Sequence, residues 1–398
     1  MSEAPWLTII GLGEDGPDGL SPASRAALER AEIVMGPPRH LSLLPDLAAE
    51  RIDWPVPFAD GVQQLMALRG RPVCVLASGD PFWFGAGSVL AGRLSPGEWR
   101  ALPGLSSFAL AASRLGWALD RTGCYGLHAA PLSRLRPSLA PEARMIVLLR
   151  DGAAVAELAD LICDAGFGAS RMVVMEALGG PRERITEAVA HALPATGFAH
   201  PVCAALEIAG DGAVLPLASG RPDSWFDSDG TMTKQPVRAL TLSALAPRPG
   251  EHLWDIGGGS GSIAIEWLLS HASLRATCIE PRPDRLARIR ANADRLGADR
   301  LQLVEGAAPA ALEGLEAPDV VFVGGGLSQA LLERLATLPA GTRIVANAVT
   351  LESEALLTQA QATLGGELMR IEIARATPLG PRRGWSAAYP VVTWSTVL

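Results

Sequence analysis

Residues 254–261 read Trp-Asp-Ile-Gly-Gly-Gly-Ser-Gly, and they carry the clearest structural signal in this chain. An apolar run ends here in a carboxylate, which is followed by a G-x-G-x-G turn. Glycines let the backbone turn sharply and pass within contact distance of a ligand that a Cβ would repel. Because glycine turns also serve as helix caps or tight loops, the flanking residues must show whether a ligand is involved.

The sequence on both sides of the turn predicts an alternating α/β unit. Residues 251–256 have the apolar character of a short buried strand, and residues 262–270 carry apolar side chains at helical spacing. A second apolar run, 276–280, ends at Glu280, about twenty residues beyond the glycines, where nucleotide-binding units place an acid that accepts hydrogen bonds from ribose. The turn is shorter than the dinucleotide pattern, so we expect a nucleoside with a smaller appendage than a second nucleotide.

The alternation continues to the end of the chain. Expected helices and strands follow in turn at 284–296, 301–304, 319–323, 328–338, 343–348 and 352–364, and two apolar stretches, 368–374 and 390–397, suit a terminal antiparallel pair. This order resembles the class I fold of S-adenosylmethionine (SAM) methyltransferases, in which the glycine loop lies beside the methionine and the acid holds the ribose. The resemblance implies SAM contacts at Thr233, Asp255, Gly257, Gly259, Gly261, Glu280, Gly306 and Ala307.

Composition limits what the chain can be. Its 398 residues predict two or three domains, and no apolar stretch approaches the length of a membrane span. Five cysteines and six histidines are scattered without a C-x-x-C pair, so we expect neither a metal site nor a disulfide framework. A net charge of −8 argues against nucleic acid as the main partner. Residues 1–5 lack the features of a signal peptide, which predicts a cytoplasmic location.

The first half of the chain has three informative loops. An apolar strand at 7–12 runs into a glycine-rich, acidic loop. A second buried strand stops at residues 78–81, Ser-Gly-Asp-Pro, which places backbone amides and a carboxylate on the usual ligand side of an open α/β sheet. Residues 103–107, Pro-Gly-Leu-Ser-Ser, precede a small-residue helix at 108–115, and their two hydroxyls either cap that helix or contact a ligand.

Together with residues 175–179, Met-Glu-Ala-Leu-Gly, these loops resemble the tetrapyrrole methylases, the class III SAM methyltransferases, over residues 5–210. The resemblance implies two α/β subdomains with SAM folded between them and a first glycine loop that lines the tetrapyrrole trough. Residues 126–130, Gly-Leu-His-Ala-Ala, match a strand that relatives write Ser-Leu-His-Gly-Arg, but they lack its arginine. The implied SAM contacts of this half are Gly79, Asp80, Pro81, Ser106 and Ser107.

The predicted fold class is therefore α/β, with a two-subdomain tetrapyrrole-methylase domain at 1–209, a linker at 210–221 and a Rossmann-like class I methyltransferase domain at 222–398. The combination resembles the fused, decarboxylating precorrin methyltransferases of cobalamin biosynthesis. That resemblance implies methylation of meso carbon 5 by the first half, and methylation of meso carbon 15 with loss of the ring C acetate carboxyl by the second. Electron-rich carbons mainly need alignment and exclusion of water, so we assign no catalytic base.

Residues that would hold the polycarboxylate precorrin are less defined. Arg382 and Arg383, in a predicted loop between the last two strands, suit carboxylate forks, although paired loop arginines are as often solvated surface. Asn347, at the end of the fifth predicted strand, is the third candidate. Lys234 either starts a helix at the surface or belongs to a Met-Thr-Lys segment that covers the SAM pocket in the family. His40 either lines the trough or, as we expect, is a loop residue without a function.

Two other functions remain open at this point. An RNA methyltransferase would share the C-terminal fold, but the acidic charge opposes it. Alternatively, the first half is a scaffold that binds no SAM and only presents the macrocycle to the second half. We expect a homo-oligomer with SAM as cofactor and without a nucleic-acid or membrane partner.

Overall fold

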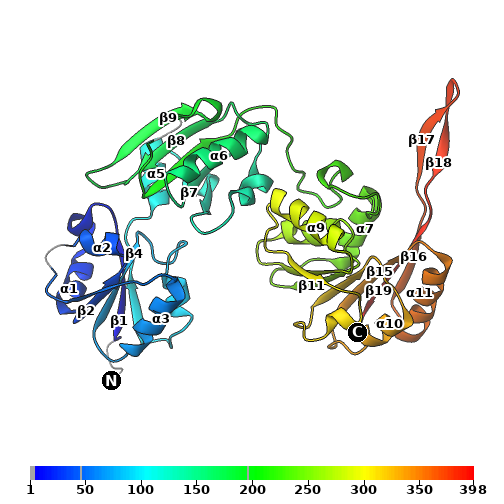
Figure 1. The fold of residues 1–398 in the computed structure, drawn as a ribbon, viewed down its shortest axis with the longest axis horizontal. Helices are drawn as coiled ribbons and strands as arrows, with labels where there is room; N and C mark the ends of the chain where they lie inside the picture. Colours follow the sequence, from blue (N-terminus) through cyan, green and yellow to red (C-terminus); the bar gives the residue numbers. More distant parts are fainter. Residues whose placement is uncertain (1–4, 45–46, 195–196) are drawn as a thin grey trace. The chain divides into compact units, whose positions relative to one another are not determined.

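The computed structural model describes residues 5–44, 47–194 and 197–398; residues 1–4, which carry most of the expectation about targeting, lie outside it. The chain forms two compact units, one of residues 1–132 and 140–213 and the other of residues 133–139 and 214–398 (Figure 1). None of the helices in the described ranges has both the length and the apolar character that a membrane crossing requires.

The first subdomain of the first unit is a parallel sheet in the order β3-β2-β4-β1-β5. Strand β1 is buried throughout, because Leu7 and Ile9 pack into one apolar cluster and Ile10 and Leu12 into the cluster on the other face. Its elements are β1 (Leu7–Leu12), α1 (Pro22–Arg30), β2 (Ile33–Gly36), α2 (Pro38–Ser42), β3 (Glu50–Asp53), α3 (Phe58–Ala67), β4 (Val73–Ser78), α4 (Gly87–Ala91) and β5 (Trp99–Leu102).

The second subdomain is a mixed sheet in the order β6-β7-β10-β8-β9, in which only β6 and β7 are parallel neighbours. Helix α5 packs on it through Phe108 and Ala111. The two α/β subdomains confirm the fold predicted for this half. The elements are α5 (Ser107–Leu115), β6 (Gly123–Gly126), β7 (Arg144–Leu148), α6 (Ala153–Asp164), β8 (Arg171–Glu176), β9 (Arg184–Val189) and β10 (Val202–Glu207).

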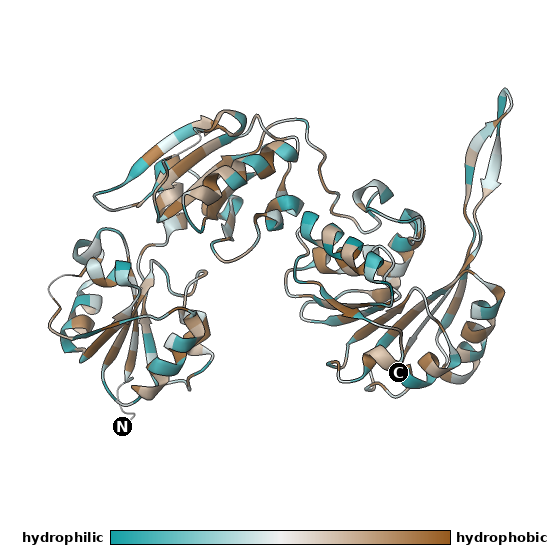
Figure 2. Cartoon of the chain, in the orientation of Figure 1, coloured by the Kyte–Doolittle hydropathy of each residue, from teal (hydrophilic) through white to brown (hydrophobic). Residues whose placement is uncertain are grey.

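The second unit is a seven-stranded sheet in the order β13-β12-β11-β14-β15-β19-β16, with β19 antiparallel to both of its neighbours. This arrangement confirms the predicted class I alternation and its terminal antiparallel pair. Figure 2 shows apolar strands between amphipathic helices. The elements are α7 (Gln235–Leu245), β11 (His252–Ile256), α8 (Ser262–Ser270), β12 (Arg275–Glu280), α9 (Pro283–Arg295), β13 (Gln302–Glu305), β14 (Val320–Val323), α10 (Gln329–Leu335), β15 (Arg343–Ala348), α11 (Leu351–Leu364), β16 (Glu367–Ile371) and β19 (Val391–Val397).

The prediction of a loop around Arg382 and Arg383 was wrong. These residues begin β18 (Arg382–Ala387), which pairs with β17 (Ala374–Leu379) in a separate two-stranded hairpin. The hairpin projects away from the seven-stranded sheet (Figure 1) and is exposed along nearly its whole length. Because neither face is buried, the sequence has no apolar alternation from which these strands could be predicted.

A buried ion cluster ties the start of the second unit to α8. The Glu266 carboxylate, fully buried, accepts hydrogen bonds from the backbone nitrogens of Gly220 (2.8 Å) and Arg221 (3.0 Å). It also accepts from the guanidinium groups of Arg221 (3.3 Å) and Arg238 (2.7 Å). Arg238 in turn donates to the carbonyl oxygens of Arg221 and Thr233. Four donors thus compensate one buried carboxylate.

Candidate functional site

A cavity of about 1030 Å³ lies in the second unit at the carboxyl ends of the parallel strands. This volume is at the top of the range of roughly 300–1,000 Å³ for small-molecule sites, so the cavity has room for more than one nucleoside-sized ligand. Its lining includes the glycine turn after β11, Glu280 at the end of β12, residues 324–326 after β14, and the segment 230–234. The turn predicted to bind a ligand therefore lies in a cavity.

The glycines of the turn have different roles. Gly257 has a φ of +76°, and a Cβ on it would lie 2.6 Å from the Gly325 nitrogen. Gly259 is more open, with the Thr231 oxygen 3.1 Å from its Cβ position. Both line the cavity, whereas Gly261 does not. A Cβ on Gly261 would lie 2.7 Å from Ile289, so this glycine is required for packing at the start of α8.

Glu280 joins the turn to the neighbouring strand. Its Oε2 accepts a hydrogen bond from the Gly259 nitrogen at 3.0 Å, and its Oε1 accepts one from the Arg282 nitrogen at 3.2 Å. The residue is 2% exposed and lines the cavity. Each carboxylate oxygen has a second lone pair, so both can accept a hydroxyl from a ligand.

Asp255 ends β11 beneath the same turn. Its Oδ2 accepts a hydrogen bond from the Ala264 nitrogen at 3.1 Å, while its buried Oδ1 has no hydrogen-bond partner within the described ranges. Burial, with a smaller contribution from the Glu280 charge, raises the pKa of Asp255 to about 7. A cationic ligand group next to Oδ1 would compensate this desolvated carboxylate.

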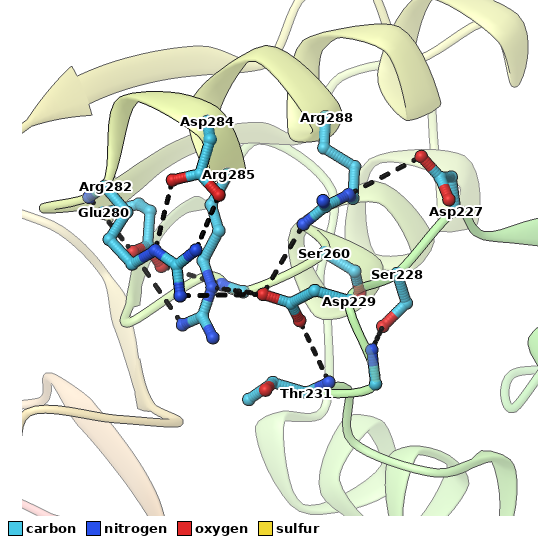
Figure 3. Close-up of polar contacts among 12 residues, drawn as sticks. Asp227, Ser228, Asp229, Thr231, Ser260, Glu280, Arg282, Asp284, Arg285 and Arg288 are labelled. Atoms are coloured by element: carbon cyan, nitrogen blue, oxygen red, sulfur yellow. Dashed lines mark hydrogen bonds and ion pairs between the residues drawn. The ribbon is translucent and has the colours of Figure 1, made fainter.

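Residues 227–231 are held against α9 by a cluster of charges (Figure 3). Asp229 accepts hydrogen bonds from the Thr231 nitrogen at 3.0 Å and from Arg285 at 2.9 Å, and it lies 3.6 Å from Arg288. The Thr231 bond, followed by Arg285, lowers the pKa of Asp229 to about 2. Asp229 is thus ionised at neutral pH. The cluster fixes the segment that leads to Thr233 and Lys234 on the cavity wall.

Five other residues of this half were predicted as contacts, and they divide into two groups. Gly306, Ala307 and Asn347 line the cavity. Asn347 donates a hydrogen bond to Thr241 (2.9 Å) and accepts one from Thr393 (2.8 Å), so its amide is already held by the protein. Arg382 and Arg383 lie on the exposed hairpin and not in the lining, and the structure therefore does not bring them together with the glycine turn.

The first unit has a cavity of about 350 Å³ between its two subdomains, which we call the first cavity; the cavity of the second unit is the second cavity. Of the residues predicted to contact SAM here, Gly79, Asp80, Ser106 and Ser107 line it. Pro81 does not, but its carbonyl oxygen lies 2.6 Å from the Cβ position of Gly85. Ser106 caps α5 by accepting a hydrogen bond from the Ala109 nitrogen at 3.1 Å, and its hydroxyl proton can still be donated to a ligand.

Three loops of the first unit meet at one point beside this cavity. The Gly79 nitrogen donates to the Leu12 oxygen at 3.0 Å, and the Gly104 nitrogen donates to the Gly79 oxygen at 3.0 Å. A Cβ on Gly11 would clash with both the Gly79 oxygen and the Gly104 nitrogen. Gly79 has a φ of +50°, and its own Cβ would lie 2.6 Å from the Leu105 oxygen. Only glycine permits this close crossing.

A polar side chain that we expected in a loop without a function lines the same cavity. His40 lies in α2 rather than in a loop and is buried, with its Nε2 3.0 Å from the Ser78 hydroxyl. Burial and the charge of Arg39 lower the pKa of His40 to about 3, so the ring is neutral. Glu14 forms ion pairs with Arg39 and with Arg182. Pro38 at the first helical position was the signal that could have placed His40 in a helix.

His128 and His200 also line this cavity, and burial lowers the pKa of both rings. Strand β6 ends before His128, so residues 127–130 are not part of the strand that the resemblance implied. His252, in contrast, begins β11 and is absent from the lining of the other cavity. In the part of the chain that the structure describes, no group of three or more His, Cys, Asp or Glu side chains could hold a metal ion.

The two halves of the chain match two different family models. The family model described as Tetrapyrrole (Corrin/Porphyrin) Methylases matches residues 6–194, and the one described as Precorrin methyltransferase domain matches residues 224–398. A precorrin-6Y C(5,15)-methyltransferase [decarboxylating] from Sinorhizobium is 51% identical over 398 residues, which cover 98% of this chain and 96% of the relative. This chain belongs to the precorrin-6Y C(5,15)-methyltransferase family. The predicted family resemblance is thereby confirmed.

Two shorter relatives of this precorrin-6Y methyltransferase family come from Salmonella typhimurium. One is a cobalt-precorrin-6B C(15)-methyltransferase (decarboxylating), 32% identical over 40% of this chain and 85% of its own length. The other is a cobalt-precorrin-7 C(5)-methyltransferase, 27% identical over 45% of this chain and 88% of its own length. The matches support the precorrin interpretation and give no support to an RNA methyltransferase.

Proposed function

We propose that this chain is a bifunctional SAM-dependent methyltransferase of cobalamin biosynthesis. It methylates meso carbons 5 and 15 of a reduced precorrin-6 and removes the carboxyl of the ring C acetate, which gives precorrin-8. The observation that carries the proposal is that each unit has its own cavity at the carboxyl ends of strands, in a family whose name specifies two methylated positions.

We assign carbon 5 to the first unit, and carbon 15 with the decarboxylation to the second. The names of the two shorter relatives support this division, because each names one of the two positions and only the C(15) enzyme is called decarboxylating. The descriptions of the family models support it as well, since a tetrapyrrole methylase precedes a precorrin methyltransferase domain.

The second cavity suits SAM in three respects. Glu280 offers two buried carboxylate oxygens to the ribose hydroxyls, and the Gly257 and Gly259 turn leaves space for a ligand that passes close to the backbone. Asp255 offers its open Oδ1 to the methionine ammonium. When bound, SAM supplies an electrophilic methyl group on a sulfonium. In the first unit, Gly79, Asp80 and the hydroxyls of Ser106 and Ser107 would hold a second SAM.

The chemistry places modest demands on the protein. A meso carbon of a reduced pyrrolic macrocycle is electron-rich, so the protein must align it with the methyl group and exclude water. After methylation, the cationic macrocycle is conjugated with the carbon that bears the acetate. The bond between the acetate methylene and its carboxyl then breaks, its electron pair enters the macrocycle, carbon dioxide leaves, and the methylene takes up a proton. The substrate thus serves as its own electron sink.

Replacement of Gly257 with valine in the full-length protein tests this assignment. The new side chain would meet the Gly325 backbone in the lining of the second cavity, so the product should carry no new methyl group at carbon 15 and retain every carboxyl. Mass spectrometry of the product after incubation with precorrin-6Y and labelled SAM measures both changes. SAM binding by the first cavity of the same molecules is the internal control for folding. Continued loss of carbon dioxide would contradict the assignment to the second unit.

The raised pKa of Asp255 predicts a pH-dependent affinity. A ligand ammonium favours the ionised carboxylate, so below about pH 7 binding must release a proton. We expect SAM affinity at this site to fall about tenfold per pH unit below pH 7 and to level off above it. The raised pKa of Asp255 also affects the free energy of unfolding without ligand. The protonated carboxyl stabilises the folded state at low pH, and this stabilisation is lost as the pH rises through about 7. Calorimetry between pH 5.5 and 7.5 measures the slope of SAM affinity against pH, and Asp255→Asn should flatten this slope. An equal slope in both proteins would show that Asp255 does not bind the SAM ammonium.

A further inference from the structure

The chain has one lysine. Among its 34 Lys and Arg residues only Lys234 is a lysine, and it lies on the wall of the second cavity, immediately before α7. Its backbone is fixed, because the Lys234 oxygen accepts a hydrogen bond from the Arg238 nitrogen at 2.8 Å and the following nitrogen donates to Asp223 at 3.0 Å. Its ammonium group forms no hydrogen bond or ion pair with the residues that the structure describes.

Arg375 is a second cation of this kind. It lies near the base of the β17–β18 hairpin, lines the same cavity and is exposed. Its guanidinium likewise forms no hydrogen bond or ion pair in the described ranges. The remaining cation of the lining, Arg285, is already paired with Asp229. Lys234 and Arg375 therefore line the cavity with charges that no group in the described ranges neutralises.

The wall beside Arg375 is apolar. Ile371 and Ile373 precede the hairpin and Val391 follows it, and all three line the cavity, with Ile371 opposite Val391 in the β16–β19 register. The segment of Lys234 belongs instead to the side of the glycine turn, because the Thr231 oxygen lies 3.1 Å from the Cβ position of Gly259. The cavity thus combines two unpaired cations with one apolar wall.

We propose that Lys234 and Arg375 bind the peripheral carboxylates of the tetrapyrrole, and that the apolar wall of Ile371, Ile373 and Val391 receives the acetate that is lost. This inference rests on the proposed function. A cation paired with the reacting carboxylate would stabilise the negative charge of that carboxylate and so slow the loss of carbon dioxide. Poor solvation instead raises the energy of the carboxylate and favours the reaction. The cations therefore bind the carboxylates that stay, and the apolar wall adjoins the one that leaves.

The two side chains suit different carboxylates. Arg375 can bind one through two parallel hydrogen bonds, which also fixes the plane of the carboxylate. Lys234 is a compact charge on a flexible stem, so it can follow a carboxylate as the macrocycle changes shape on methylation. Arg382 and Arg383 lie beyond Arg375 on the hairpin and outside the cavity lining, and this proposal gives them no contact with the substrate.

Single glutamine variants of the full-length protein test the proposal. Lys234→Gln and Arg375→Gln should each raise the KM for precorrin-6Y in the carbon 15 reaction about 10- to 100-fold, since each removes a charged hydrogen bond. The Kd for SAM should stay within about twofold of the parent value. Arg370→Gln, which removes an exposed ion pair with Glu372 outside the cavity, is the matched control and should change neither value.

The single lysine provides a direct readout. Reductive methylation with labelled formaldehyde keeps the positive charge and modifies only Lys234 and the N-terminal amine, so the NMR spectrum has one side-chain signal. Addition of precorrin-6Y should shift that signal. The Lys234→Arg variant lacks the signal but keeps the positive charge, so its KM should be close to that of the parent protein and well below that of Lys234→Gln. A shift with SAM alone, together with an unchanged KM in Lys234→Gln, would place Lys234 in the SAM site and overturn the proposal.

Three further outcomes are distinguishable. If Arg382→Gln and Arg383→Gln raise the KM while Arg375→Gln does not, the hairpin tip and not its base binds the substrate, and the proposal is wrong for Arg375. If the parent protein itself neither methylates precorrin-6Y nor shows the NMR shift, the proposed function fails. Normal turnover by the parent and by all variants would refute only the carboxylate assignment.

Discussion

Replacement of Glu280 with glutamine should eliminate methylation at carbon 15 and the decarboxylation, while SAM binding in the first cavity continues. The carboxylate accepts hydrogen bonds from the Gly259 and Arg282 nitrogens and is 2% exposed. A glutamine amide would direct an N–H group at one of these donors and could accept only one ribose hydroxyl. We expect the SAM affinity of the second cavity to fall at least about 100-fold.

Calorimetry can measure this effect directly. The parent protein should bind two SAM molecules per chain and the Glu280→Gln variant only one in the same concentration range. Glu305→Gln is the matched control, because Glu305 ends the adjacent strand β13 in register with Glu280 but is exposed and does not line the cavity. Two unchanged binding sites in Glu280→Gln would exclude this carboxylate from SAM binding.

Replacement of Gly11 with alanine should have the opposite selectivity. The added methyl group would clash with the Gly79 oxygen and the Gly104 nitrogen, which are backbone atoms and cannot rotate away. We expect the three-loop crossing to open, at a cost of about 1–3 kcal/mol or more, and methylation at carbon 5 to be lost. Product mass and urea unfolding followed by fluorescence measure the two effects.

Gly92→Ala is the control for this substitution. Gly92 follows α4 with a φ of −67°, and its Cβ position is 3.4 Å from its nearest neighbour, the Ser88 oxygen, so alanine should be tolerated there. Retention of methylation at carbon 15 by Gly11→Ala would show that the second unit is intact. Full activity at carbon 5 would mean that the crossing tolerates a Cβ and does not shape the first site.

Local signals predicted the second unit well. The sequence placed α8 at residues 262–270, as observed, because a glycine turn defines its start and its apolar spacing defines its length. Strand β15, from Arg343 to Ala348, is buried along most of its length, and its apolar run predicted both of its ends. The same reasoning failed for the hairpin, whose strands pair only with each other and have no buried face.

The candidate site was predictable only in part. The backbone motifs of Gly257 and Glu280 have a spacing that can be counted along the chain, and both residues line one cavity. Whether the Asp255 Oδ1 has a hydrogen-bond donor depends on the tertiary structure around it, so residue spacing along the sequence does not predict it. The charges of Lys234 and Arg375, which have no partner among the described residues, likewise depend on the tertiary structure. Side chains that bind a variable substrate are therefore harder to predict from sequence than a glycine turn that binds a nucleoside.

The buried Glu266 cluster has a consequence for how the second unit can be made on its own. Gly220 and Arg221 fall at the end of the predicted linker, yet both are buried and donate to Glu266. A gene fragment that starts at residue 222 would encode a carboxylate inside α8 with three of its four donors missing, and a buried charge left short of partners costs several kcal/mol. The first codon of a separately expressed second unit therefore belongs upstream of Gly220.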